Sequence, residues 1–157
     1  MEKDLRLRKI EGRLYSNGQG VIIFSVWDII QIIMMFTMNS QYVLERAGVV
    51  NVDSTTTTIA LVFVAVVAFI ATLVDVYIGR SAMAFSRGEK KGILYIVLAG
   101  LSVIICVLGT VFTVVDDPTS AIENAKTLVE SIITLTKTII MIELVVNSIQ
   151  LRRSEVK

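Results

Sequence analysis

The sequence predicts an all-α integral membrane protein, a four-helix bundle with both termini in the cytoplasm. Three observations support this fold class: the mean hydropathy is +0.74, the apolar residues fall into four long segments, and most basic residues flank those segments on one side. Only 18% of the 157 residues are charged, whereas soluble domains contain roughly 25%. We expect residues 1–157 to form a single membrane domain.

Each apolar segment has a length close to the roughly 20 residues that a helix needs to cross the hydrocarbon core. The segments lie at about 21–38, 58–78, 93–115 and 127–149. The third contains no charged residue, so it lacks the polar face of a soluble surface helix. No segment alternates with the period of a barrel strand, and a helix satisfies its own backbone in lipid. Four helical spans are therefore expected.

The basic residues indicate how these spans are oriented. Five precede the first segment, four lie between the second and third, and three follow the fourth. Only Arg46 and Lys126 lie in the remaining flanks, and Lys137 is inside the last segment. Because cytoplasmic loops carry an excess of Lys and Arg, both termini and the middle loop are expected in the cytoplasm. Residues 150–157 would then form a cytoplasmic tail.

The basic N-terminal segment, residues 1–19, has two interpretations. Leu7, Ile10 and Leu14 have the spacing of one helical face, which suits a short helix lying on the inner leaflet. An orienting flank without fixed structure explains the charges equally well. In either case we expect basic side chains to face anionic lipid. These side chains are Arg6, Arg8, Lys9, Arg13, Arg87, Lys90 and Lys91.

Charged residues within the apolar segments predict a polar network inside the membrane. An ionisable side chain at the bilayer centre costs about 2.5–3.5 kcal/mol, so it is normally paired or functional. Asp28 lies within about 3 Å of the middle of the first span, and Lys137 within about 2 Å of the middle of the fourth. Their opposite charges and matching depths predict an ion pair, which Gln31 extends from one turn away.

Two more acidic residues lie nearer the cytoplasmic side. Counted from the span centres, Asp75 is about 10 Å and Glu143 about 8 Å below the middle. Both are expected to meet an aqueous vestibule or the basic residues of the middle loop. The predicted intramembrane network thus comprises Asp28, Gln31, Asp75, Lys137 and Glu143.

Small residues at helical spacing predict where the spans approach each other closely. On the second span a stripe runs through Ala65, Ala68 and Thr72 and continues to Asp75 and Gly79. The third span has a stripe through Ser102, Cys106 and Gly109. Asp75 lies on such a stripe, so it is expected to face protein rather than lipid.

The composition also narrows the possible functions. The chain has no histidine, one cysteine and no recognisable catalytic or nucleotide-binding motif, so we expect neither an enzyme nor a metal or cofactor. The net charge of +1 gives no general field for nucleic acid. Two functions remain open. One is a transporter or channel for a proton or cation. The other is a scaffold or accessory subunit whose buried charges fix packing or recognise a partner.

The surroundings of the chain follow from the same features. A polar route between only four helices is narrow, so a homo-oligomer or a membrane protein partner is expected. The lack of disulfides and glycosylation sequons fits a bacterial inner membrane.

Overall fold

The computed structural model describes residues 2–38, 54–116 and 125–155, which form four helices. In chain order these are α1 (Glu2–Met38), α3 (Ser54–Ser86), α4 (Leu94–Asp116) and α6 (Ala125–Glu155). Their side chains are described over residues 5–34, 58–59, 62–108 and 131–154. The predicted all-helical class is therefore confirmed for the described part of the chain.

Three helices contain stretches long and apolar enough to cross a membrane, namely Leu5–Met34, Val62–Ser86 and Ser131–Ser154. In α4 the stretch with described side chains, Leu94–Leu108, is apolar but shorter. Large apolar side chains are exposed on all four helices, for example Ile23, Phe63, Ile104 and Leu135. A helix that presents such a surface is suited to lipid. These features support a membrane protein.

The helices extend well beyond the apolar segments of the sequence. Helix α1 has 37 residues, which corresponds to about 55 Å at 1.5 Å per residue. It includes the basic N-terminal residues, so neither the separate interfacial helix nor the unstructured flank that we considered is present. No proline interrupts the chain here, but Gly18 and Gly20 each weaken a helix locally, so packing against the neighbouring helices supports the continuation. Gly18, which lies between the two parts, packs tightly against α3.

Helix α3 ends in a capping motif. The amide of Gly88 donates to the carbonyl of Phe85 at 3.0 Å, and the amide of Glu89 donates to that of Ala84 at 3.2 Å. Gly88 has a φ of 84°, a left-handed conformation that glycine adopts without steric cost. This is the Schellman arrangement, which satisfies the last carbonyls of a helix. It reverses the chain towards α4.

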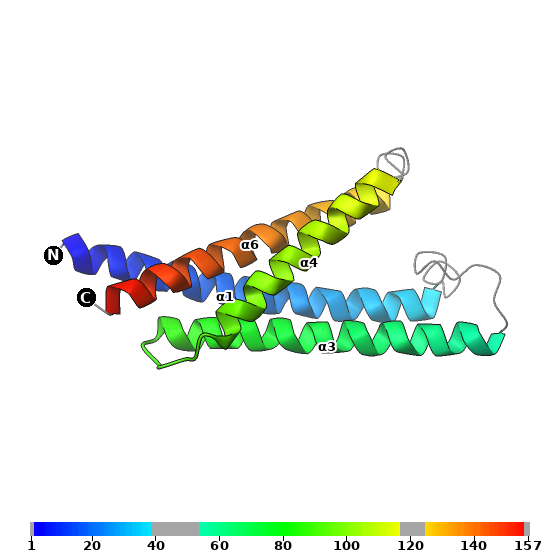
Figure 1. Ribbon diagram of the computed structural model, residues 1–157, viewed down its shortest axis with the longest axis horizontal. Coiled ribbons are helices and arrows are strands. Elements are labelled where there is room, and N and C mark those ends of the chain that lie inside the picture. Colours follow the sequence, from blue (N-terminus) through cyan, green and yellow to red (C-terminus); the bar gives the residue numbers. More distant parts are fainter. Residues whose placement is uncertain (1, 39–53, 117–124, 156–157) are drawn as a thin grey trace.

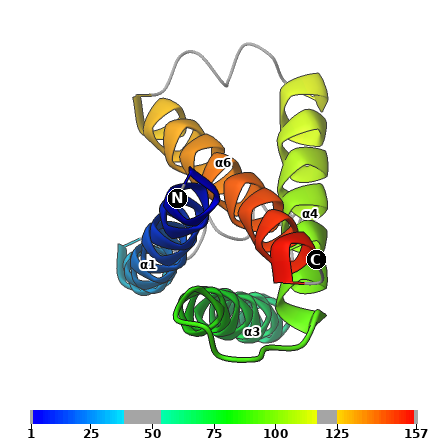
Figure 2. The same ribbon diagram turned by 90° about the vertical axis from the view of Figure 1, so that its left-hand side faces the viewer.

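The four helices meet at one end of the molecule and diverge at the other (Figure 1). Helices α1 and α3 lie antiparallel, while α4 and α6 diverge from them (Figure 1) and also from each other (Figure 2). The start of α1, the end of α6 and the α3–α4 turn lie at the closed end (Figure 1). The helices thus pack together at this end and separate towards the other.

Burial follows the same division. Among the described side chains, every buried one lies within residues 14–25 of α1, 72–85 of α3, 95–99 of α4 or 141–151 of α6. The core includes Leu14, Ile78, Tyr95 and Leu144. All of these stretches belong to the closed end, so the hydrophobic core stops about halfway along the helices.

Candidate functional site: an ion triad between three helices

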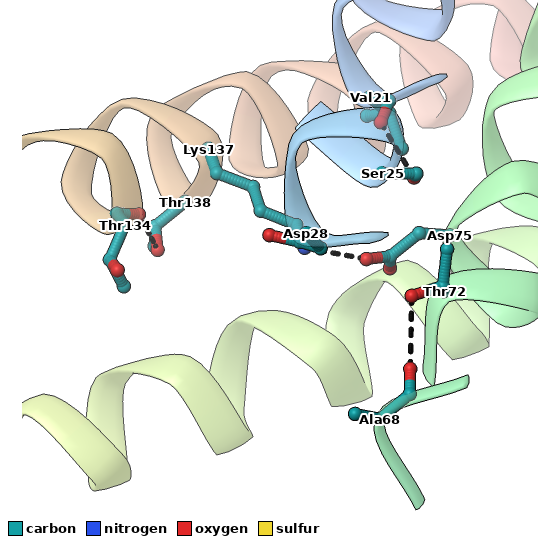
Figure 3. Close-up of polar contacts among 9 residues, drawn as sticks. All are labelled: Val21, Ser25, Asp28, Ala68, Thr72, Asp75, Thr134, Lys137 and Thr138. Atoms are coloured by element: carbon teal, nitrogen blue, oxygen red, sulfur yellow. Dashed lines mark hydrogen bonds and ion pairs between the residues drawn. The ribbon is translucent and has the colours of Figure 1, made fainter. Parts of the chain in front are cut away.

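Lys137 of α6 reaches two carboxylates on two other helices (Figure 3). Its Nζ lies 2.6 Å from Oδ2 of Asp28 on α1 and 2.6 Å from Oδ2 of Asp75 on α3. The exposed fraction of the side chain is 16% for Lys137, 29% for Asp28 and 8% for Asp75. We call these three residues the ion triad. It joins three helices through charge-assisted contacts that are partly shielded from solvent.

The ion pair predicted between Asp28 and Lys137 is present. The depth predicted for Asp75 is wrong, because its carboxylate contacts Lys137 at the level of Asp28 and not the basic residues of the middle loop. A residue count from the centre of an apolar segment gives the depth in the membrane only when all helices are parallel and their centres are level. Helix α3 instead extends to Ser86, eight positions beyond the expected end at Ile78, and the long lysine side chain spans part of the remaining offset.

The other two members of the predicted network do not contact Lys137, and only Gln31 lies beside the triad. Gln31 lines the same cavity as Asp28 and Asp75. Glu143 is exposed, and its Oε2 accepts a hydrogen bond from Nδ2 of Asn17 at 3.3 Å. Asn17 was not among the predicted residues, because an amide side chain in a basic segment gives no distinctive signal in the sequence. Glu143 therefore belongs to an α1–α6 contact nearer the closed end.

Three nearby hydroxyl groups donate hydrogen bonds to backbone carbonyls of their own helices. Oγ of Ser25 donates to the carbonyl of Val21 at 2.8 Å, and Oγ1 of Thr72 donates to that of Ala68 at 2.9 Å (Figure 3). Oγ1 of Thr138, next to Lys137, donates to the carbonyl of Thr134 at 2.8 Å. These bonds to the preceding turn occupy the hydroxyl protons. These three hydroxyl groups therefore do not donate to the carboxylates of the triad.

The triad contains more acidic groups than basic groups. When all three groups are ionised, two carboxylates face one ammonium. Within the described residues no other cation forms an ion pair with Asp28 or Asp75. An uncompensated charge is costly in a site of low dielectric constant. The arrangement therefore favours the uptake of one more positive charge, either as a proton on a carboxylate or as a bound cation.

Two partly open cavities meet at the triad. The first, of about 320 Å³, lies beside α1 and is lined by Asp28, Gln31 and Ala65 together with Asp75 and Lys137. The second, of about 300 Å³, lies beside α4 and shares Asp75 and Lys137. We call them the α1-side cavity and the α4-side cavity. Because the buried core ends at this level, the triad lies where the closed end meets the diverging helices.

The predicted packing stripes border these cavities. Ala65 and Ala68 line the α1-side cavity, as does Thr72, which is 3% exposed. Ser102 and Cys106 line the α4-side cavity. The surroundings of Gly109 lie outside the described residues. Most of these small residues thus widen the space around the triad.

A close backbone approach occurs elsewhere, between Gly18 and Gly79. A Cβ added at Gly18 would lie 2.7 Å from the carbonyl oxygen of Gly79, and one added at Gly79 would lie 2.6 Å from that of Gly18. Gly79 was the last position of the predicted stripe on its helix, but its partner on α1 could not be read from the sequence.

The basic residues predicted to face lipid are mostly exposed. Arg6, Arg8, Lys9, Arg13, Arg87 and Lys90 are exposed, and Lys91 is half-buried. Arg87 also has a protein partner, because its Nη2 donates to the hydroxyl of Tyr15 at 3.1 Å and its guanidinium lies 5.1 Å from the centre of that ring. Lys91 lies 3.3 Å from the carboxylate of Glu89.

No group of three or more metal-ligating side chains occurs among the described residues. The candidate site is thus the ion triad with its two cavities. In comparisons with known proteins, no family model, no curated protein and no solved structure matches this chain.

Proposed function

We propose that this protein crosses a membrane four times and binds a proton or monovalent cation at the ion triad as part of transport. The observation that supports this function best is the unequal triad, in which one ammonium contacts two carboxylates from different helices. Ionisable residues inside membrane spans commonly mark ion or proton routes.

The four crossings and their direction follow from length and charge. Helix α4 has 23 residues, all uncharged before Asp116, which is enough to span roughly 30 Å of hydrocarbon. The exposed basic residues of α1 and of the α3–α4 turn belong to the closed end (Figure 1). We therefore place the closed end on the cytoplasmic side of a bacterial inner membrane, where its basic side chains face anionic lipid. The end at which the helices diverge would then lie on the opposite side of the membrane.

The proposed mechanism is a competition for the carboxylates. A proton or cation on Asp75 would weaken the hold of that carboxylate on Lys137. Lys137 would then remain attached through Asp28 alone, and α6 would be freer to move relative to α3. A ligand changes the population of two conformations only through different affinities for them. Here the difference arises because Lys137 and the ligand compete for the same oxygen atoms.

Assembly is the second part of the proposal. The cavities beside the triad are partly open, and beyond the triad, on the diverging side, no described side chain is buried. A homo-oligomer or a membrane protein partner would enclose this route. If the partner rather than the triad carries the function, the chain acts as an accessory subunit.

Flux through reconstituted protein tests the proposal. Purified protein is placed in liposomes, and proton, Na⁺ and K⁺ fluxes are measured with trapped dyes under an imposed pH gradient or membrane potential. We expect flux above that of empty liposomes, and we expect Asp75→Asn to reduce it to that background. Glu143→Gln is the matched control, because it removes an exposed carboxylate outside the triad, and its flux should equal that of the wild-type protein.

Two results would contradict the proposed transport through the ion triad. The first is the absence of flux across the ion and pH panel, and the second is an unchanged flux in Asp75→Asn. Absence of flux together with a membrane protein that co-purifies in mild detergent would support the accessory role.

A further inference from the structure

The triad already contains a bound alkylammonium ion in the form of the Lys137 side chain. Its Nζ meets Oδ2 of Asp28 and Oδ2 of Asp75 at 2.6 Å each. These distances require N–H donors that approach the carboxylates directly, as in charge-assisted hydrogen bonds. The two carboxylates thus already bind a primary ammonium group, which belongs to the chain itself.

The α4-side cavity is charged at one point and mostly apolar elsewhere. Asp75 and Lys137 provide the charges, while Leu98, Leu101 and Cys106 belong to the apolar wall. Asp75 lines this cavity as well as the α1-side cavity, and the residue as a whole is only 5% exposed. A volume of about 300 Å³ is at the lower end of pockets that hold small organic ligands.

Few oxygen atoms are available to replace the hydration shell of a metal ion. Hard cations such as Ca²⁺ take six to eight oxygen ligands. Besides Asp75, the cavity is lined by the hydroxyl residues Ser102 and Thr138, and the Thr138 hydroxyl already donates to the carbonyl of Thr134. A primary ammonium ion needs only a few acceptors, and an attached hydrocarbon chain gains from burial in the apolar wall.

We infer that the α4-side cavity binds a primary alkylammonium ion, with the ammonium on Asp75 and the hydrocarbon chain against Leu98, Leu101 and Cys106. The ligand supplies the positive charge that the triad lacks, and it competes with Lys137 for Asp75. This inference rests on the proposed cation site, and it names the class of cation. Binding requires N–H donors, so an alkyltrimethylammonium ion of the same chain length binds much more weakly.

Cys106 provides a local readout, since it is the single cysteine of the chain and lines the cavity. Purified wild-type protein in detergent is treated with a small uncharged thiol reagent, and the rate of Cys106 modification is followed by mass spectrometry. Titration with n-butylamine at a pH where it is charged should slow the reaction saturably. For simple competition the rate falls by a factor of 1 + [L]/Kd, or about elevenfold at ten times Kd.

Three controls separate specific binding from partition into detergent. n-Butanol has the hydrocarbon chain without the charge, and butyltrimethylammonium has the charge without N–H donors; neither should protect Cys106 strongly. Asp75→Asn should abolish the protection by butylamine, whereas Glu143→Gln should retain it. Equal protection by butanol, or full protection in Asp75→Asn, would overturn the inference.

A chemical rescue gives an independent measurement that does not depend on thiol reactivity. Lys137→Ala retains Cβ and removes three methylene groups and the ammonium, which together correspond to n-propylamine. We expect n-propylamine to raise the melting temperature of Lys137→Ala, with little effect from n-propanol or trimethylamine. If the variant is recovered only when propylamine is present during purification, that also supports the inference. Absence of both rescue and Cys106 protection overturns it, even when proton or Na⁺ flux establishes transport.

Discussion

The ammonium of Lys137 lies 2.6 Å from the carboxylate of Asp75, in addition to its equally short contact with Asp28. Asp75 is the most buried of the three charges, with a side chain 8% exposed. Lys137 is thus shared between two helices, and removal of either aspartate leaves it one partner. Removal of the lysine, in contrast, leaves two carboxylates facing each other.

This asymmetry predicts an order of stabilities. Lys137→Met should destabilise the protein by about 3–5 kcal/mol, because the loss of one partner leaves buried charge uncompensated. Asp28→Asn should cost less than about 2 kcal/mol, since Lys137 keeps its contact with Asp75. The measurement is thermal or denaturant unfolding in detergent, followed by circular dichroism.

Combined variants distinguish the triad from a simple pair. Lys137→Met with Asp28→Asn still leaves Asp75 charged, so it should recover little stability. Adding Asp75→Asn to that double variant should recover most of the loss, because no unpaired charge remains. Full recovery in the double variant would show that Asp75 does not share Lys137.

The contact between Gly18 and Gly79 predicts that neither position accepts a larger side chain. Gly18→Ala would place its Cβ 2.7 Å from the Gly79 carbonyl oxygen, so α1 and α3 must separate, at a cost of about 1–3 kcal/mol. Gly100→Ala is the matched control, because a Cβ there meets nothing within 4 Å. Alanine should leave stability unchanged or raise it by up to about 1 kcal/mol. Equal melting temperatures for both variants would contradict this helix contact.

Arg152 is expected to hold the α3–α4 turn in place. Its Nη2 donates to the carbonyls of Lys91 and Gly92, the latter at 2.7 Å, and its guanidinium lies 5.1 Å from the centre of the Phe85 ring. Arg152→Ala should speed hydrogen exchange in residues 87–93 and cost about 1.5–3 kcal/mol. Arg152→Lys should retain only part of this stability and protection, because lysine lacks the planar guanidinium group that donates to two carbonyls at once. Arg153→Ala, which removes an exposed neighbour, should change neither quantity.

The proposed orientation predicts where the α3–α4 turn can be labelled. Glu89 in this turn is exposed, so Glu89→Cys in a Cys106→Ser background carries one accessible thiol. A membrane-impermeant maleimide should label it only after the cells are permeabilised. Labelling in intact cells would reverse the orientation that we propose.

How far the sequence predicts this site depends on the residue. The match of Asp28 with Lys137 was predictable, because both lie near the centres of their apolar segments and carry opposite charges. The contact of Asp75 was not, since the depth of a residue along its own helix says nothing about how neighbouring helices are shifted. The contact of Glu143 was not predictable either, because its partner Asn17 lies in the basic segment, which was not expected to continue the helix of the first span.

The sequence by itself determined the helical class, the apolar stretches and the residues whose charges need a partner. These properties depend on local composition and on the high cost of exposing backbone or charge to hydrocarbon. Only the tertiary structure decided that three charges share one site, that α1 continues through its basic segment, and that the helices diverge beyond the triad. Helix register and crossing arise from contacts between residues far apart in the chain, such as Gly18 with Gly79, and those contacts leave no periodic signal in the sequence.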